Sequence, residues 1–207
     1  ITNPHSPSGT WLEEAEVRRI IDASADALVV LDEAYVHYSE TSGYIHLVHE
    51  YENLAVLRTF SKAYGLAGLR IGFGVASQPI IDTLMAVKPT WNLGQLQIVG
   101  GVAALNDHEH VARTVRTIVE NRDYVERRFE ELDRFRMVRG SRSNFFLVEI
   151  LDLDTDSTKV FEGLLERGVV VKDGSVSFRG LDDRFLRCDV NLQIHMDRLV
   201  DALNDLP

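Results

Sequence analysis

Residues 59–72 read Thr59-Phe60-Ser61-Lys62-Ala63-Tyr64-Gly65-Leu66-Ala67-Gly68-Leu69-Arg70-Ile71-Gly72. This stretch joins two apolar runs, Leu54 to Phe60 and Leu69 to Ala76. Short continuous apolar runs are typical of strands that are buried on both faces of a sheet. The stretch therefore predicts a strand, a turn and a second strand, with Ser61 and Lys62 directly after the first strand.

Another apolar run, Ala27 to Leu31, predicts a further strand, which ends in Asp32-Glu33-Ala34-Tyr35. Reactive side chains in α/β sheets gather beyond the carboxyl ends of the strands. We therefore expect Asp32 and Tyr35 to share one crevice with Lys62.

The rest of the chain alternates predicted helices and strands, which indicates an α/β fold. Thr10 is placed to cap a first helix that runs to about Ser24, with Glu13 as its capping-box partner. Apolar positions keep helical spacing from Glu109 to Phe135, which predicts one long amphipathic helix. After this helix, the pattern changes to short predicted strands that alternate with helices, which places a domain boundary near Leu132 to Gly140. Further helices are expected over 79–87, 96–105, 157–167 and 194–203, and further strands over 144–150, 169–171 and 185–190.

Composition restricts the class of protein. The net charge of −10 argues against nucleic acid as a partner. No apolar run approaches the roughly 20 residues of a membrane helix, and Ile1-Thr2-Asn3-Pro4 does not read as a signal peptide. The single cysteine, Cys188, allows neither an internal disulfide nor a zinc site. We therefore expect a structural thiol, no metal and a cytoplasmic location.

The residues at the predicted strand ends fit a pyridoxal-phosphate (PLP) site. A desolvated lysine such as Lys62 forms Schiff bases with carbonyl compounds, and Asp32 is a suitable partner for a protonated pyridine nitrogen. Tyr35 can donate a hydrogen bond to a ring oxygen, while Ser61 and Arg70 offer donors to a phosphate. On residue type alone, a surface lysine and an aspartate that caps a turn remain open alternatives.

The run from Thr59 to Gly72 closely resembles the cofactor-lysine motif of the class I/II aminotransferases, and within them it is most similar to histidinol-phosphate aminotransferases. Two more blocks resemble that family in the same order. Asn3-Pro4-His5-Ser6-Pro7-Ser8-Gly9-Thr10 resembles its Asn-Pro-x-x-Pro-[Ser/Thr]-Gly loop, and Asp32-Glu33-Ala34-Tyr35 resembles its Asp-Glu-Ala-Tyr strand. The resemblance continues weakly to Phe185-Leu186-Arg187 and so covers nearly the whole chain.

This resemblance implies a fold like that of the type I PLP transferases. Residues 1–132 would form the C-terminal part of a large α/β/α domain with a mostly parallel sheet, and residues 133–207 a small α+β domain. The family's proteins are much longer than this chain. We therefore expect a preceding segment to supply part of the sheet and of the phosphate site.

The resemblance also implies a role for each matching residue. Lys62 holds PLP as a Schiff base and moves protons, Asp32 pairs with the ring nitrogen, and Tyr35 and Asn3 bond the ring oxygen. Ser61 and Arg70 hold the phosphate. Arg187 binds the substrate's α-carboxylate, with Arg179 as the alternative. The implied activity is ping-pong transfer of an amino group between an amino acid, or a histidinol-phosphate-like amine, and a 2-oxo acid in a homodimer.

Departures from the family's pattern bear on the substrate. His5 and Ser6 replace a frequent Asn-Asn, and Cys188-Asp189-Val190-Asn191 follows Arg187 where the family often has Ile-Thr-Val-Gly. Trp91 either lines a substrate pocket or packs in the interior. Three alternatives remain open at this point: a PLP-dependent decarboxylase or lyase on the same fold, an inactive truncated paralogue, and a generic α/β binding domain.

Overall fold

The computed structural model describes all 207 residues, which divide into two compact units. Unit 1 comprises Ile1–His5 and Trp11–Val115, and unit 2 comprises Ser6–Thr10 and Arg116–Pro207. Helix α4 (His108–Phe129) begins in unit 1 and ends in unit 2. The domain boundary expected near Leu132 stays a prediction.

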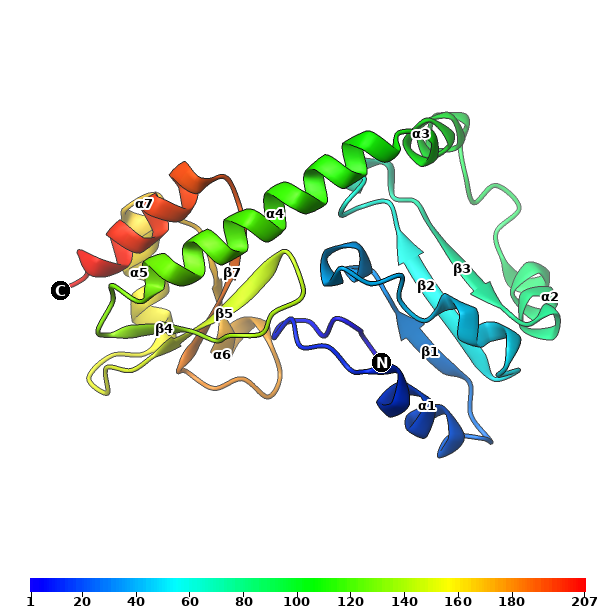
Figure 1. Cartoon of the computed structure of the whole chain (residues 1–207), viewed down its shortest axis with the longest axis horizontal. Coiled ribbons are helices and arrows are strands. Elements are labelled where there is room, and N and C mark those ends of the chain that lie inside the picture. The colour runs from blue at the N-terminus through cyan, green and yellow to red at the C-terminus, as the bar shows by residue number, and fades with distance from the viewer. The chain divides into compact units, whose positions relative to one another are not determined.

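Unit 1 contains a three-stranded sheet in the order β1-β2-β3 (Figure 1). Its strands are β1 (Val29–Asp32), β2 (Leu54–Thr59) and β3 (Gly72–Ala76), which confirms the three predicted strands. β1 and β2 are parallel, whereas β2 and β3 are antiparallel. The α/β class is therefore confirmed, with a sheet that is mixed over these three strands.

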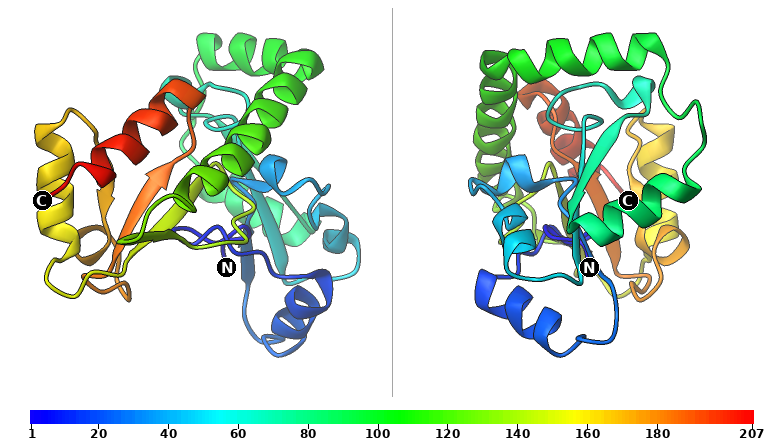
Figure 2. Two further views of the ribbon diagram at one scale, coloured as in Figure 1. Left: turned by 60° about the vertical axis from the view of Figure 1, so that its left-hand side comes forward. Right: turned by 90° about the vertical axis from the view of Figure 1, so that its right-hand side faces the viewer.

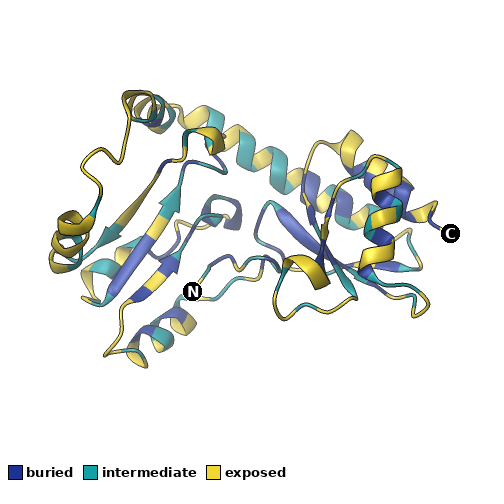
Figure 3. Cartoon of the chain, turned by 180° about the vertical axis from the view of Figure 1, so that it is seen from behind, coloured by how far each residue is buried: buried dark blue, intermediate teal, exposed yellow.

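One face of this sheet is covered. Val17 and Ile21 of α1 (Glu14–Asp22) pack with Leu31, Leu54 and other buried apolar residues of unit 1. Along β1, buried residues alternate with less buried ones such as the exposed Val30. Every residue of β3 is exposed or half-buried (Figure 3). The expectation that the strands are buried on both faces is therefore wrong for β1 and β3, whereas β2 buries the consecutive residues Leu54, Ala55 and Val56.

Helix α1 begins later than expected, because hydrogen bonds to Asn3 hold the backbone of Leu12 outside the helix. The Asn3 side chain bonds both backbone groups of Leu12, which keeps that residue out of a helical first turn. The N-cap is Glu13, whose backbone N–H donates to Glu16 Oε2 at 2.8 Å in a capping box. The capping box exists, but three residues after the one predicted from Thr10.

The remaining elements of unit 1 are short 3-10 helices and two exposed helices. The 3-10 helices are η1 (Val36–Ser39), η2 (Ile45–His49) and η3 (Ala67–Leu69). The α-helices are α2 (Gln78–Val87) and α3 (Gln95–Asn106), of which only Gly101 is buried. Both match helices predicted from the sequence.

Unit 2 contains an antiparallel sheet in the order β4-β5-β7-β6 (Figures 1 and 2). Its core joins sheet residues to the second half of α4 and to the helices α5 and α7. The elements are β4 (Phe135–Met137), β5 (Phe145–Ile150), α5 (Ser157–Glu166), β6 (Lys172–Asp173), α6 (Gly174–Ser177), β7 (Phe185–Asp189) and α7 (Gln193–Asn204).

Two elements of unit 2 differ from expectation. Helix α4 ends at Phe129, short of the predicted Phe135, because Phe135 pairs with Ile150 as the first residue of β4. The strand expected over 169–171 forms instead at Lys172 and Asp173, where it pairs with β7. A pairing between distant segments decides both boundaries, and local spacing does not reveal it.

Residues 6–10 complete unit 2 from far away in the sequence. The Arg142 backbone N–H donates to the Gly9 carbonyl at 2.8 Å. Gly9 has a φ of +73°, and a Cβ there would lie 2.0 Å from Ser141 Oγ. Only glycine meets both conditions, which accounts for the glycine of this loop motif.

None of the helices combines the length and the apolar composition that crossing a membrane requires.

Candidate active site

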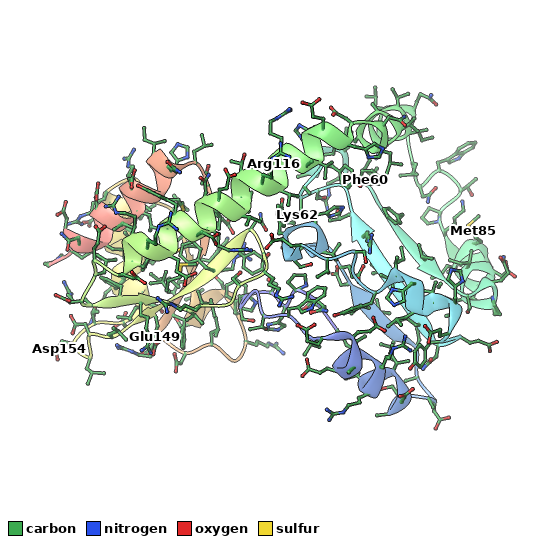
Figure 4. All side chains as sticks on the ribbon, in the orientation of Figure 1. Phe60, Lys62, Met85, Arg116, Glu149 and Asp154 are labelled. Carbon is green, nitrogen blue, oxygen red and sulfur yellow. The ribbon has the colours of Figure 1, made fainter.

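The carboxyl ends of β1 and β2 lie at the same edge of the sheet, because the strands are parallel and Asp32 is the register partner of Leu57. Lys62 follows β2 in the next turn (Figure 4). Its Nζ lies 5.1 Å from the centroid of the Tyr35 ring. The structure thus brings together groups from the two predicted strand ends.

Asp32 is fixed by its backbone and by its side chain. Its Oδ1 accepts a hydrogen bond from the Ala34 backbone N–H at 2.9 Å. Its backbone N–H donates to Ile1 O at 2.8 Å, and its carbonyl accepts from Asn3 N at 2.9 Å. The carboxylate is therefore held at the strand end in a defined place.

A buried ion pair lies next to Asp32. The fully buried Glu33 carboxylate accepts hydrogen bonds at Oε2 from Arg58 Nε at 2.9 Å and Nη2 at 2.7 Å. Glu33 Oε1 accepts from the Tyr44 backbone N–H, and a Cβ on Gly43 would approach this carboxylate to 2.6 Å. The pair therefore ties the segment before η2 to the ends of β1 and β2.

Sequence reasoning did not single out this pair, although a signal was present. Arg58 is a charged residue inside a run that reads as a buried strand, and Glu33 follows directly after another such run. Opposite charges in two neighbouring buried strands indicate a pair, because an unpaired buried charge is costly.

The turn that carries Lys62 is held by backbone bonds. The Gly65 N–H donates to the Lys62 carbonyl and the Leu66 N–H to the Phe60 carbonyl, both at 2.9 Å. Gly65 has a φ of +71°, which favours glycine. The turn is therefore tight and specified by the backbone.

Aromatic contacts support the same turn. The Tyr64 ring lies 4.8 Å from that of Phe60 and 5.2 Å, edge to face, from that of His37. Burial, with a smaller contribution from the Arg58 charge, lowers the pKa of His37. A neutral His37 therefore packs against the loop of Lys62 at neutral pH.

The two expected phosphate donors differ in their surroundings. The Ser61 backbone N–H donates to Thr59 Oγ1 at 3.0 Å, and the Ser61 side chain is half-buried. Arg70 is exposed with a φ of +54°, and its Nη1 donates to the Ala67 carbonyl at 3.0 Å. Both lie on the segments that flank the Lys62 turn.

Asn3 has a different environment from the one expected. It is fully buried; its Nδ2 donates to Leu12 O at 3.1 Å and its Oδ1 accepts from Leu12 N at 2.8 Å. Both ends of the amide are thus engaged in setting the start of α1. The role of Asn3 toward a cofactor oxygen stays a prediction, and the observed hydrogen bonds compete with it.

Of the two candidate carboxylate ligands, only Arg187 has a guanidinium that is packed against aromatic rings and paired with a carboxylate. Its guanidinium carbon lies 4.5 Å from the Phe145 centroid and 5.7 Å from the Phe178 centroid. Its Nη2 donates to Asp189 Oδ1 at 2.7 Å, while its buried Nε has no hydrogen-bond partner. Arg179 is exposed in the loop after α6. Both arginines belong to unit 2.

Trp91 and Cys188 differ in their exposure to solvent. Trp91 is 90% exposed, which excludes packing in the interior of this chain. Cys188 is buried in β7, and burial raises the pKa of its thiol far above the usual range, so the group stays protonated. A structural thiol was the expectation.

The residues of unit 1 fit a phosphorylated pyridine cofactor by their donors and acceptors. Lys62 supplies an amine beside an aromatic ring, and Asp32 supplies a carboxylate fixed by a backbone N–H. Arg70 holds an exposed guanidinium in the same connecting segment as Ser61, and a guanidinium suits a phosphate. The donor set therefore matches the chemistry expected from the sequence.

Relatives of this chain are named as aminotransferases. The family model described as aminotransferase class I and II matches residues 1–203. The histidinol-phosphate aminotransferase of Methanocaldococcus jannaschii is 38% identical over 210 residues, which cover all of this chain and 54% of that protein. The histidinol-phosphate aminotransferase 1 of Psychrobacter arcticus is 36% identical, with 54% of its length covered. The chain thus spans about half the length of these curated relatives.

Solved structures share the fold at lower identity. The chain matches the histidinol-phosphate aminotransferase of Sinorhizobium meliloti in complex with pyridoxal-5'-phosphate with a TM-score of 0.87 at 23% identity, covering all of this chain and 57% of that one. It matches the L-threonine-O-3-phosphate decarboxylase of Porphyromonas gingivalis with a TM-score of 0.86 at 24% identity, covering 99% and 62%. Because the family model spans almost every residue, the chain belongs to the class I and II aminotransferases.

Proposed function

We propose that this chain carries the Schiff-base lysine and the ring-nitrogen partner of a PLP-dependent aminotransferase. The proposed reaction transfers an amino group between an amino acid, or a histidinol-phosphate-like amine, and a 2-oxo acid by a ping-pong mechanism. The observation that carries the proposal is the contact of Lys62 with Tyr35 at the shared edge of β1 and β2, with Asp32 at the end of β1.

PLP supplies an electron-poor ring that stabilises negative charge at the substrate's α-carbon. Lys62 would hold this group covalently and would act as the general base toward the α-proton of the substrate. Asp32 keeps a proton on the ring nitrogen by its negative charge. Tyr35 donates a hydrogen bond to the ring oxygen, a role assigned to Asn3 as well.

Ser61 and Arg70 bind the phosphate in this proposal. The hydroxyl and the guanidinium donate hydrogen bonds to an anion, and they fix its position relative to Lys62. Arg187 binds the α-carboxylate of the amino acid or the 2-oxo acid, and the Phe145 and Phe178 rings lie against its guanidinium. Arg179 is the alternative ligand. These assignments follow from the matched motifs and the chemistry of each side chain.

The test is an absorbance spectrum of the protein with added PLP, before and after borohydride reduction. We expect a visible band that reduction removes and a cofactor adduct that peptide mapping locates on Lys62. An adduct on Lys88, Lys159 or Lys172 with none on Lys62 would sink the proposal. Adding an amino donor and a 2-oxo acid then tests for transfer of the amino group.

A decarboxylase is the second candidate, because the fold of the L-threonine-O-3-phosphate decarboxylase of Porphyromonas gingivalis matches this chain with a TM-score of 0.86. The two reactions differ in their products. Release of carbon dioxide without formation of a new keto acid would favour decarboxylation. Formation of a keto acid without carbon dioxide would favour amino-group transfer. The homodimer and the cytoplasmic location belong to this proposal and are tested by sedimentation and by fractionation.

A further inference from the structure

Arg187 and Asp189 form an ion pair along one face of β7. Residues two apart on a strand project to the same side, and Arg187 Nη2 lies 2.7 Å from Asp189 Oδ1. The Arg187 side chain is 17% exposed, whereas that of Asp189 is 62% exposed. The carboxylate therefore reaches a shielded guanidinium from the solvent side.

The guanidinium is held independently of this carboxylate. The ring centroids of Phe145 and Phe178 lie 4.5 and 5.7 Å from the guanidinium carbon. Phe145 is the cross-strand partner of Asp189, so one wall of the site belongs to the sheet itself. The Arg187 Nε is buried without a hydrogen-bond partner. The rings therefore fix the guanidinium, and a second carboxylate has to take over the bond that Nη2 makes to Asp189.

The other aromatic wall is fixed by the segment before it. Asp173 accepts hydrogen bonds from Ser157 Oγ at 2.6 Å and Thr158 Oγ1 at 2.7 Å. A Cβ on Gly174 would lie 2.3 Å from the Phe185 carbonyl, so α6 packs tightly against β7. Phe178 directly follows α6. Its position beside Arg187 is therefore built into the fold.

We propose that Asp189 is an internal competitor for the substrate carboxylate at Arg187. A 2-oxo acid binds by displacing Asp189, while an amino alcohol without an α-carboxylate enters with the ion pair intact. Exposed ion pairs are weak, and a bidentate carboxylate on a guanidinium is stronger, so displacement is feasible. This inference rests on the proposed function for its assignment of Arg187 as the carboxylate ligand.

The test compares Asp189→Asn with the unchanged chain. The amide keeps the size of the side chain and removes its charge. We expect glutarate, an unreactive dicarboxylate, to bind about two- to five-fold more tightly by calorimetry, the range expected when an exposed ion pair is lost. The uncharged diamide of glutarate serves as the matched ligand, and its binding should not change.

Kinetics of the PLP-loaded enzyme give the second readout. We expect Asp189→Asn to lower the KM for the 2-oxo acid by the same factor and to leave kcat unchanged. The KM for a carboxylate-free amino alcohol phosphate should not change. A merely structural role for the ion pair would affect both substrates alike, together with the melting temperature.

Two variants serve as controls. Asp154→Asn removes an exposed carboxylate elsewhere in unit 2 and should not alter glutarate binding. Arg187→Ala should weaken glutarate binding, and adding Asp189→Asn to it should give no further change, because the cycle isolates the coupling of the two residues.

The outcomes separate this inference from the proposed function. Tighter glutarate binding in Asp189→Asn, with a cofactor adduct on another lysine and none on Lys62, supports the competitor role and rejects the proposed function. Amino-group transfer with unchanged glutarate affinity in Asp189→Asn rejects the competitor role alone. The role is also rejected if Asp154→Asn has the same effect, if the effect persists without Arg187, or if no variant binds glutarate.

Discussion

The two units bury their apolar side chains to different extents. In unit 2, β5 buries five of its six residues, and helices from three parts of the sequence complete the core. In unit 1, no residue of β3 is buried, and α2 exposes Leu84, Met85 and Val87 (Figure 3). The apolar runs of unit 1 predicted that its three strands are buried as well. The difference teaches that an apolar run shows only that a segment can be buried. The elements that pack against the segment decide how much of it is buried.

The largest expected effect concerns Lys62 of unit 1, the unit whose apolar side chains are less buried. Lys62→Ala should remove the borohydride-fixed cofactor and lower turnover by about 10²- to 10⁴-fold, because the general base is lost. Lys159→Ala, at an exposed lysine of unit 2, is the matched control and should leave both unchanged. Normal turnover in Lys62→Ala would show that the reactive lysine lies elsewhere.

Truncating one phenylalanine in each unit sharpens the comparison directly. Phe146 is fully buried in unit 2 and packs edge to face on Phe129, so Phe146→Ala should lower the free energy of unfolding by about 3–5 kcal/mol. Phe73 in β3 is 39% exposed, and Phe73→Ala should cost less than about 1 kcal/mol. Chemical denaturation measures both. Equal losses would mean that the exposed face of β3 is covered in solution.

Unit 1 nevertheless contains a buried polar contact that should matter for stability. Glu33→Ala leaves the Arg58 guanidinium without its carboxylate partner and should cost about 3 kcal/mol. Glu33→Ala combined with Arg58→Met should recover part of that loss, since the uncompensated charge is removed. A larger loss in the double variant would show that the cost arises from packing and not from the unpaired charge.

Asp173 gives unit 2 a smaller, pH-dependent contribution. Burial alone would raise its pKa, but hydrogen bonds from Ser157, Thr158 and Ser175 together hold the pKa below its usual value. A lowered folded-state pKa stabilises the fold above the unfolded pKa, and this stability is lost as the pH falls through the folded value. Asp173→Asn should therefore cost about 1–3 kcal/mol at pH 7 and less near pH 3, as measured by urea unfolding. A cost that does not depend on pH would exclude the charge as its origin.

Much of the fold could be predicted from local pattern, and the failures have one cause. The three strands of unit 1 and helices α2, α3, α5 and α7 follow from apolar spacing and turn residues. The start of α1, the end of α4 and the place of β6 do not follow from spacing, because contacts with distant segments decide them. Asn3 holding Leu12 is one such contact, and Phe135 pairing with Ile150 is another.

The candidate site divides in the same way. Lys62, Asp32 and Tyr35 could be placed in advance, because parallel strands bring their carboxyl ends to one edge. The Glu33–Arg58 pair and the ion pair of Arg187 with Asp189 were not predicted, because opposite charges on strands suggest a pair but do not fix the register or the side-chain direction that forms it. The sequence therefore indicates the candidate functional groups better than the residues that hold them in place.

The discontinuity of unit 2 has a consequence for the order of folding. Residues 6–10 are synthesised before Ser141 and Arg142, which contact Gly9 and follow more than a hundred residues later. The loop of residues 6–10 therefore has no partner until residues 11–115 of unit 1 and the segment up to Arg142 have been made. Contacts of such long sequence separation slow folding, because loop-closure entropy is lost before they form. Docking of this loop is therefore expected to be a late event, one that links completion of unit 2 to prior folding of unit 1.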